Sequence, residues 1–482
     1  HRLLPKLFPP FSILENNAMQ SAASAAGYMT GAGLVNAIPA LMMLNPAAVP
    51  GMWVLMAWIL LISWLGVFLA VPAKRQMINI EQLRFPSGIA AAETLRALHS
   101  VGESGMRSAR ALGWAGLLAV VSKFWTEGLV VVRAKLAPFM IGTWVPALSQ
   151  RVFGPAWMGR TVMFSWEPMF IAAGAITGLH VCWSMFLGSA TAWMIFAPVL
   201  QHRAIIQGSG YLTIVQWTLW GGVACMVTSS LLSFGLQWRT ALRAFTDLRA
   251  MFGGGRGAAG DQVGAIETPA SWFIAGELIG FLGLAWLGHR TFGMPYWQTA
   301  VAVALSFALA LVACRVTGET GTTPVGAMGK ITQLTFGALS PGHMNINLMG
   351  ANITAAAAGS SADLLTDLKS GYLLGAHPRK QFIAQFAGIF VGTLVSVLCF
   401  RLLVPDASAL GTDQFPAPAA QTWRAVAFAL SEGLGALGPV KIWCIAVGGL
   451  VGIALTLLPR IFPARRHLIP SPAGVGLAWT FH

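Results

Sequence analysis

The most regular feature of the sequence is a series of long apolar segments, separated by short stretches that carry most of the charged residues. A helix needs roughly 20 mostly apolar residues to cross the hydrocarbon core of a bilayer. Tryptophans lie near the ends of several of these segments, as in the aromatic belts of membrane helices. We predict membrane-spanning helices over residues 50–71, 109–132, 161–179, 181–200, 211–236, 270–288, 294–314, 383–404 and 440–458.

A second set of segments is shorter, more polar, or interrupted by proline and glycine, and these segments are poor candidates for simple spans. Together with the clear spans they predict an all-α, polytopic transmembrane bundle with about 10 to 12 membrane-embedded segments, some of them broken or re-entrant. The weaker segments are residues 17–44, 85–98, 136–148, 320–340, 343–362 and 421–438.

The composition excludes a soluble fold. Hydrophobic residues make up 56% of the 482 residues and charged residues only 10%, with a mean hydropathy of +0.68. A soluble globular domain carries about 25% charged residues. The formal net charge is +14, but the basic residues lie between apolar segments and form no stripe with interleaved aromatics. Nucleic-acid binding is therefore not expected.

Basic residues gather in four of the polar stretches, which the positive-inside rule places on the cytoplasmic side of the membrane. Residues 405–420 carry Asp406 and Asp413 but no basic residue, so we expect them on the outer side. The chain must then cross the membrane once between residue 420, on the outer side, and the cytoplasmic cluster that begins at Arg460. We assign this crossing to 440–458 and expect 421–438 to be a re-entrant or interfacial segment. The basic clusters are Lys74, Arg75 and Arg84; Arg239, Arg243, Arg249 and Arg256; His377, Arg379 and Lys380; and Arg460, Arg465 and Arg466.

We expect a single integral membrane domain over residues 1–482, with the basic, glycine-rich stretch 237–268 as a cytoplasmic loop. Both ends of the chain are abrupt, so we interpret the sequence as a fragment of a longer chain. The cysteines form no CxxC pair and lie in or beside apolar segments, so we interpret them as buried, unreactive thiols. They are Cys182, Cys225, Cys314, Cys399 and Cys444.

Residues 343–362 combine several amides with a run of alanine, glycine and serine. So few bulky side chains would make a poor lipid-facing helix, and we expect protein to enclose the segment at the centre of the bundle. His343, Asn345 and Asn347 would share one side of an extended stretch, whereas Asn345 and Asn352 would share one face of a helix. Either arrangement makes a polar ledge for a peptide-like ligand; the alternative is that these asparagines only link helices.

The N-terminal block has the same character. Asn16, Asn17 and Gln20 precede a run of small residues, and residues 17, 20, 24, 27 and 31 fall at spacings of three or four. On a helix these positions form one small and polar face. In a membrane protein such a face is expected to meet a cavity or another helix.

Acidic residues inside predicted spans are candidates for proton coupling. An ionisable residue at membrane depth is costly and marks an ion or proton pathway by default, which points to Glu127, Glu167 and Glu277. Alternatives remain open, because Lys123 lies four residues before Glu127 and could pair with it. Pro168 follows Glu167 and indicates a helix start, where a carboxylate is also favoured.

Charged residues also follow the 343–362 segment. We interpret them as a cytoplasmic loop before the next span, and it stays open whether this stretch is also part of a gate. They are Asp363, Asp367, Lys369, Arg379 and Lys380.

Four stretches together resemble the oligopeptide transporter (OPT) family, and in particular its prokaryotic branch, which is related to the plant yellow-stripe-like transporters. They are FSILENNAMQSAASAAGYMTGAG (11–33), LRFPSGIAAAETLRA (83–97), MNINLMGANITAAAAGSSADLLTDLKSGYLLGAHPRKQFIAQFAGI (344–389) and IPSPAGVGLAW (469–479). The resemblance implies secondary transport, with proton-coupled uptake of small peptides or metal–chelate complexes. It also implies that the ENN and NxNxxxxN blocks lie in the core transport region.

We therefore expect a multi-pass symporter of the inner (cytoplasmic) membrane. Its expected partners are a peptide or metal-chelate substrate, protons, the lipid bilayer and, as an open possibility, a second copy of the chain in a homodimer. No enzyme activity, resident metal or cofactor is expected, because motifs such as HExxH, GxSxG and Walker A are missing from the sequence. The alternatives are a passive channel and a membrane-embedded lipid-modifying enzyme. The expected substrate ledge consists of Asn16, Asn17, Gln20, His343, Asn345, Asn347 and Asn352.

Overall fold

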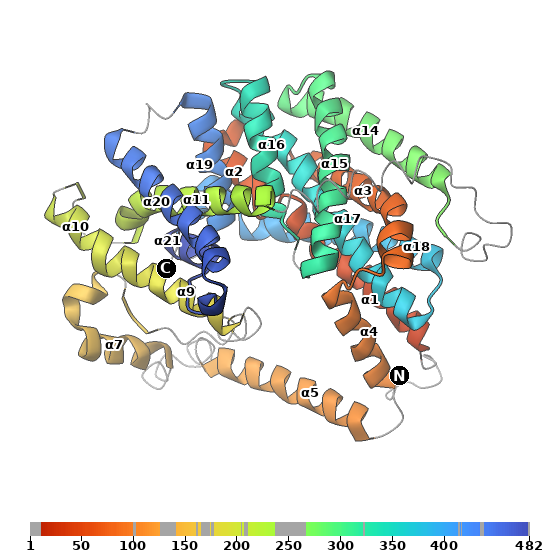
Figure 1. Ribbon diagram of the computed structural model, residues 1–482, viewed down its shortest axis with the longest axis horizontal. Coiled ribbons are helices and arrows are strands. Elements are labelled where there is room, and N and C mark those ends of the chain that lie inside the picture. Colours follow the sequence, from red (N-terminus) through yellow and green to blue (C-terminus); the bar gives the residue numbers. More distant parts are fainter. Residues whose placement is uncertain are drawn as a thin grey trace. The chain divides into compact units, whose positions relative to one another are not determined.

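The computed structural model shows a helical protein (Figure 1). Every element of its described residues is a helix, which confirms the all-α fold class. Most of the loop 237–268 and of the segment 161–179 lies outside these residues. The structure describes residues 11–99, 103–125, 141–160, 162–164, 174, 178–203, 205–206, 211–236, 267–321, 323–412, 415, 417–433 and 438–480.

Seven stretches of the described residues are long and apolar enough to cross a membrane. This result supports the prediction of a polytopic membrane protein, and most of the stretches coincide with spans that the hydrophobic pattern predicts. They are Ile13–Leu44, Met52–Ile80, Leu179–His202, Ser271–Phe292, Tyr296–Gly318, Pro378–Leu403 and Pro439–Ile461.

The chain divides into two compact units, residues 1–99 with 230–436 and residues 100–229 with 437–482. The first contains α1 (Ile13–Tyr28), η1 (Met29–Ala32), α2 (Ala37–Leu44), η2 (Pro46–Ala48), α3 (Met52–Lys74), η3 (Arg75–Ile80), α4 (Pro86–His99), α14 (Ala270–Phe292), α15 (Tyr296–Thr320), α16 (Val325–Leu339), α17 (Met344–Leu374), α18 (Pro378–Leu403), η7 (Ala407–Ala409) and α19 (Pro418–Glu432). The second contains α5 (Glu103–Lys123), α7 (Ile141–Met158), α9 (Leu179–Ala190), η6 (Thr191–Phe196), α10 (Ala197–His202), most of α11 (Tyr211–Leu236), α20 (Pro439–Ile461), η9 (Pro463–Arg465) and α21 (Pro472–Thr480).

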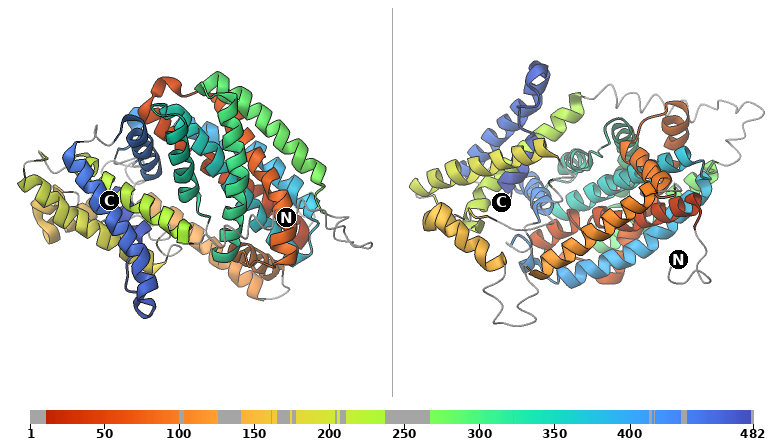
Figure 2. Two further views of the ribbon diagram at one scale, coloured as in Figure 1. Left: turned by 45° about the horizontal axis from the view of Figure 1, so that its top comes forward. Right: turned by 90° about the horizontal axis from the view of Figure 1, so that it is seen from below.

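Helix α17 lies at the centre of the first unit (Figures 1 and 2), where it packs against α15, α16, α3, α4 and α1. Most of its 31 residues are buried, including the alanine run 355–358. Small side chains allow close approach, since a Cβ added at Gly66 of α3 would lie 2.6 Å from the carbonyl oxygen of Ala357. The prediction that protein encloses this segment is confirmed for its buried part, from Ile346 onward.

The first candidate span, which the sequence marks as a weak segment over residues 17–44, is a broken helix. Helix α1 begins with a capping box: Oγ of Ser12 accepts a hydrogen bond from the N–H of Glu15 (3.2 Å), and the Glu15 carboxylate accepts one from the N–H of Ser12 (2.7 Å). The helical path is interrupted at Gly33, where φ is 130°, a value that favours glycine. The chain then resumes as α2 after Asn36, whose side chain caps the new helix.

Glycines let α1 and α18 pack closely. A Cβ at Gly388 would collide with the carbonyl of Ala22, whereas a Cβ at Gly27 would meet no atom within 4 Å. We expect Gly388→Ala to lower the free energy of unfolding by about 1–3 kcal/mol through overpacking. Gly27→Ala should be neutral or stabilising by up to about 1 kcal/mol, because alanine is the better helix former. Thermal unfolding of the purified variants tests this pair, and equal shifts in Tm would contradict it.

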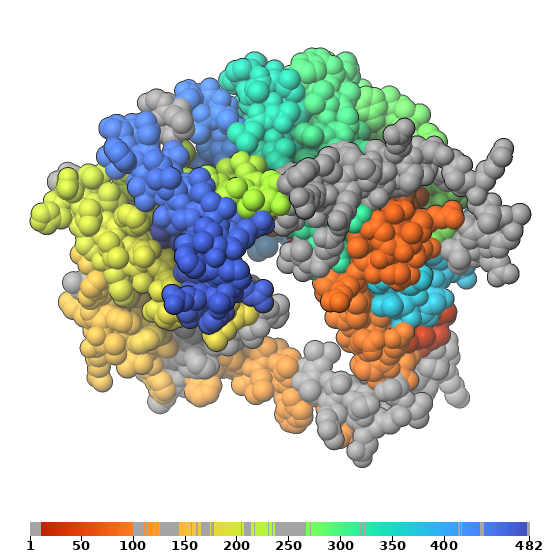
Figure 3. All heavy atoms as spheres, viewed as in Figure 1, coloured from red at the N-terminus to blue at the C-terminus, as the bar shows by residue number. Residues whose placement is uncertain are grey.

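In the second unit, α9 and α21 lie side by side, and α20 adjoins α21. Figure 3 shows the C-terminal helices (blue) directly against α9 (yellow). Here too glycines permit close contact, because a Cβ at Gly188 would lie 2.8 Å from the Cβ of Ala478. The indole N–H of Trp479 donates to the carbonyl of Gly188 (3.0 Å) and fixes the end of α21.

All five cysteines are free thiols. Cys225 and Cys314 are buried, and Cys182 and Cys444 are partly buried, as the apolar surroundings predict. The expectation of burial is wrong for Cys399, which is exposed on α18. Neighbouring positions of α18, such as Leu398 and Leu402, are exposed as well, so this face of the helix is apolar and uncovered in the isolated chain.

Candidate functional site

The C-terminal half of α17 carries a polar cluster that meets α1 and α18. Gln20 donates a hydrogen bond from its side-chain amide to Oδ1 of Asp367 (2.9 Å). Gln381 donates to the hydroxyl of Ser21 (2.9 Å) and to the main-chain carbonyl of Asp367. Three helices thus converge on one acidic residue. We call this the Asp367 cluster, which consists of Asn17, Gln20, Ser21, Asp367, Ser370 and Gln381.

The carboxyl group of Asp367 is only partly satisfied. The residue is 3% exposed, and its Oδ2 atom is buried without a hydrogen-bond partner in the described part of the chain. Asp363 precedes it by one helical turn and is partly buried. An unpaired carboxylate anion is costly in such surroundings, whereas a neutral carboxylic acid is tolerated. The arrangement is therefore suited to hold a proton.

A cavity of about 210 Å³ lies beside the Asp367 cluster, at the junction of α17 and α18. Gln381 belongs to the cluster and also lines the cavity. On the opposite wall Lys74 forms an ion pair with Glu267, and Asn79 donates to the same carboxylate (3.0 Å). Polar groups therefore extend from the cavity wall to the buried carboxyl group.

A second polar cluster lies where α16 meets the N-terminal part of α17. We call it the Lys330 cluster; it consists of the hydrogen-bonded pair Gln333 and Asn347 and of Lys330, one turn earlier on α16, and these residues are 0%, 1% and 5% exposed. Asn347 donates to the main-chain carbonyl of Gln333 (2.6 Å), and the Gln333 side chain donates to the carbonyl of Trp423 (3.1 Å). The side-chain oxygens of Gln333 and Asn347 are buried, and neither has a hydrogen-bond partner within the described ranges.

The ammonium group of Lys330 is the unusual member of this cluster. Among the described residues it makes one hydrogen bond, to the carbonyl of Gly326 (3.3 Å). The ammonium is directed toward Gly326, one turn before Lys330, whereas Gln333, with its partner Asn347, lies about one turn after it. A buried ammonium complements a carboxylate, and acceptor oxygens about one turn further along complement N–H donors. Sequence reasoning did not single out Lys330, although a lysine within the small-residue segment GAMGK was a signal that could have found it.

Asn352 links helices. Its Nδ2 donates to the carbonyl of Ala32 (3.0 Å), and its Oδ1 accepts from the indole N–H of Trp58 (3.0 Å). The amide packs against Gly33, so it satisfies the backbone where the first span is broken. Both polar atoms of Asn352 are therefore occupied in this conformation.

The other residues of the expected ledge have different surroundings. Asn17 is buried and hydrogen-bonds to α17, while Asn16 is partly buried and donates to Nε2 of His99 (2.9 Å). His343 is exposed just before α17, and Asn345 is partly buried in its first turn. These two residues lie nearer to solvent than the Lys330 cluster does.

The structure thus places the seven residues in two groups rather than on one ledge. Asn16, Asn17 and Gln20 lie toward the Asp367 end of α17, and the residues from 343 to 352 lie at the other end. Twenty residues of helix separate Asn347 from Asp367, or about 30 Å at 1.5 Å per residue. Their role in binding remains a prediction.

Of the three glutamates proposed for proton coupling, Glu277 lies in a described span. It is partly buried in α14, and its Oε1 atom has no hydrogen-bond partner there. Glu127 and Glu167 lie outside the described residues. Glu277 therefore stays a candidate proton carrier, and Asp367 joins it.

The interpretation of the charged stretch after residue 362 as a loop is wrong for all five residues. Arg379 and Lys380 already belong to the first turn of α18. Asp363, Asp367 and Lys369 lie within α17, which continues to Leu374. Their charges suggested solvent, but the partners that make their burial possible come from distant segments. Gln20 and Asp367 are 347 positions apart in the chain, so a local sequence pattern cannot predict their contact.

Buried ionisable residues and amides inside a helical membrane bundle are typical of membrane proteins that move ions or solutes. The family profile of the OPT oligopeptide transporter protein matches residues 1–482. The chain therefore belongs to the OPT oligopeptide transporter family, as the sequence motifs predict.

Three relatives illustrate the similarity. A Saccharomyces cerevisiae protein named "Putative oligopeptide transporter" is 24% identical over 98% of this chain and 81% of its own length. A Haemophilus influenzae protein with the same description is 25% identical over 83% of this chain. A "Probable metal-nicotianamine transporter" of Oryza sativa subsp. japonica is 22% identical over 89% of this chain. The alignment covers 66% of each of the last two relatives, so this chain spans just under two thirds of their length.

Proposed function

We propose that this chain is a secondary active transporter that couples uptake of small oligopeptides or metal–chelate complexes to proton symport across the inner membrane. The observation that carries the proposal is a pair of buried ionisable residues, Asp367 on α17 and Lys330 on α16, the helix that packs against α17. The family and the names of the relatives support the two substrate classes.

The Lys330 cluster is our candidate for substrate recognition. Peptides and amino-carboxylate chelators both carry carboxylates, which suit the ammonium of Lys330, and N–H donors, which suit the free oxygens of Gln333 and Asn347. His343 and Asn345, at the start of α17, are placed to meet a substrate that enters from this end. Removal from water strengthens each of these interactions.

The Asp367 cluster is our candidate for proton coupling, with Glu277 as a second candidate. Protonation neutralises the buried carboxyl group, and deprotonation leaves a charge that favours exposure to the neighbouring cavity. The three N-terminal amides then serve proton coupling rather than substrate binding. Gln20 and Asn17 contact α17 near Asp367, and Asn16 contacts α4. The small residues between the two clusters suit a helix that slides or rocks against its neighbours.

The test is substrate-driven proton uptake by protein reconstituted in liposomes that contain a pH-sensitive dye. Addition of a transported peptide or chelate should acidify the lumen in proportion to substrate uptake. Substrate flux without proton movement, or conductance that does not saturate, would contradict symport and favour a passive channel.

Two asparagine variants separate a binding role from a structural role. We expect Asn345→Ala to weaken substrate affinity by about fivefold, the worth of one ordinary hydrogen bond, with little effect on Tm. Asn352→Ala should instead destabilise the protein by about 2–4 kcal/mol, because it leaves the indole of Trp58 and the carbonyl of Ala32 unpaired in the interior. Transport kinetics and thermal unfolding measure the two effects. Unchanged affinity in both variants would show that the asparagines only hold helices together.

A further inference from the structure

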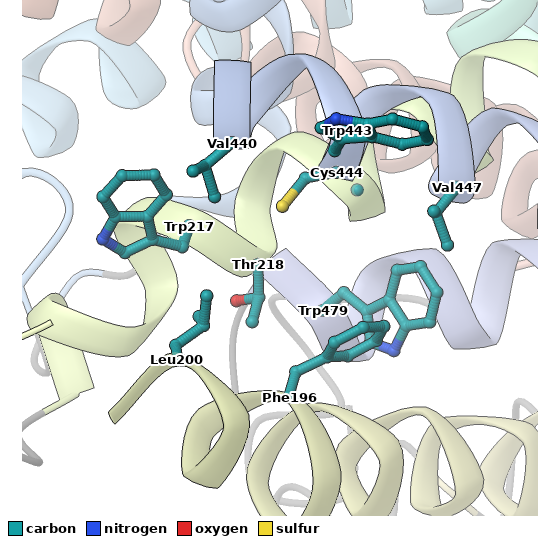
Figure 4. Close-up of a pocket in the computed structure, with 10 residues that line it drawn as sticks. Phe196, Leu200, Trp217, Thr218, Val440, Trp443, Cys444, Val447 and Trp479 are labelled. Carbon is teal, nitrogen blue, oxygen red and sulfur yellow. The ribbon is translucent and has the colours of Figure 1, made fainter. Parts of the chain in front are cut away.

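A second cavity, of about 190 Å³, lies within the second unit between η6, α10, α11, α20 and α21 (Figure 4). Its walls are almost entirely apolar and rich in aromatic rings, among them Phe196, Trp217, Trp443 and Trp479. The ring of Trp479 is fixed by its hydrogen bonds to Gly188 and by an edge-to-face contact with Phe196 (5.6 Å between centroids). The cavity therefore has preformed walls.

Two polar atoms on the wall are left without partners. The indole Nε1 of Trp217 and the hydroxyl of Thr218 are buried, and neither makes a hydrogen bond within the described part of the chain. Both residues belong to α11 and line the cavity (Figure 4). Apolar cavities of this size stay dry, so water is a poor partner for them. A ligand that brings acceptor oxygens would satisfy these donors when their side chains turn toward the cavity.

A positive charge lies next to the same wall. The ammonium of Lys441 lies 5.6 Å from the ring centroid of Trp217 and 5.9 Å from that of Trp220. Lys441 is in the first turn of α20, and the ends of membrane helices, with their tryptophans and lysines, lie at the lipid headgroups. Val440, Cys444 and Val447 continue the wall along α20 from this turn toward the middle of the helix.

We propose that this cavity binds one glycerophospholipid from the surrounding bilayer. An acyl chain fills the apolar space, the ester carbonyls accept hydrogen bonds from Trp217 and Thr218 when these side chains turn toward the cavity, and the phosphate faces Lys441. Along α20, Lys441 precedes the wall residues Cys444 and Val447, just as the phosphate precedes the acyl chain in the lipid. The chemistry of the wall selects a phospholipid over the peptide or chelate substrates, which lack a long alkyl chain.

The test uses protein in phosphatidylcholine nanodiscs that contain phosphatidylglycerol with a photoactivatable diazirine on one acyl chain. Mass spectrometry should find cross-links concentrated on the cavity-lining parts of η6, α10 and α20. Val447→Trp fills the cavity and should reduce this labelling about tenfold. The control is Leu450→Trp, on the same helix but 67% exposed and outside the cavity wall, which should change labelling little. Equal labelling along all faces of α20, with equal effects of both variants, would overturn the proposal.

Two milder variants keep the test independent of folding defects. Trp217→Phe removes only the indole N–H, and Lys441→Gln removes only the charge, so each should weaken competition by unlabelled phosphatidylglycerol about fivefold. Neither variant should alter competition by a long-chain alkane. If competition by both compounds changes equally, or if neither variant has an effect, the cavity holds any alkyl chain and is not a phospholipid site.

Discussion

Replacement of Asp367 by asparagine is expected to abolish substrate-driven proton uptake while it leaves substrate exchange intact. Asparagine keeps the oxygen that accepts the hydrogen bond from Gln20, and it has nearly the same shape. It cannot take up or release a proton. Counterflow, in which labelled substrate exchanges for unlabelled substrate across the liposome membrane, needs no net proton movement and should continue. The proton signal should fall to the level of empty liposomes.

The thermal stability of Asp367→Asn provides a second test of the proposed role of Asp367. Because Oδ2 of Asp367 is buried without a described partner, loss of the ionisable group should not lower Tm and could raise it. Asp406→Asn is the matched control, since Asp406 is exposed and should leave coupling unchanged. Glu277→Gln decides between the two candidates: if it stops proton uptake and Asp367→Asn does not, then Glu277 carries the proton. If no single acidic substitution, including those at Glu127 and Glu167, uncouples transport, a carboxylate is not the carrier.

The sequence was sufficient to predict the enclosed position of α17. Its Asn, Ala, Gly and Ser content is too polar and too small for a lipid-facing helix, and that argument needs no tertiary information. The long apolar spans follow in the same way from length and composition. These features depend on properties of neighbouring residues in the chain, which a linear pattern records.

The polar clusters could not be predicted in the same way. Asp367 was interpreted as part of a loop because a charged residue is normally solvated, and its actual partners, Gln20 and Gln381, lie on two other helices. Asn347 and Asn352 were placed on one ledge with Gln20, but the rise along α17 separates them from Gln20. A one-dimensional pattern shows which side chains are polar; the packing of helices decides which of them meet.

Replacement of Lys330 by methionine is expected to weaken binding of carboxylate substrates by about 10- to 100-fold, the worth of a charge-assisted hydrogen bond in the interior. Methionine has a similar length and fills the same space without the ammonium. The variant should also be at least as stable as the wild type without substrate, because a buried ammonium with one described hydrogen bond costs free energy. A gain in Tm together with a loss of affinity would show that the charge is kept for binding.

A substrate variant makes this prediction specific. A peptide whose C-terminal carboxylate is converted to an amide should bind the wild type more weakly, and it should bind Lys330→Met with nearly the same affinity as the free acid. The double-mutant cycle then isolates the interaction between the ammonium and the carboxylate from any general effect on packing. Lys380→Gln, at an exposed lysine, is the control and should leave both affinities unchanged. If Lys330→Met weakens the acid and the amide equally, the ammonium does not bind the carboxylate, and the Lys330 cluster is a structural contact between α16 and α17.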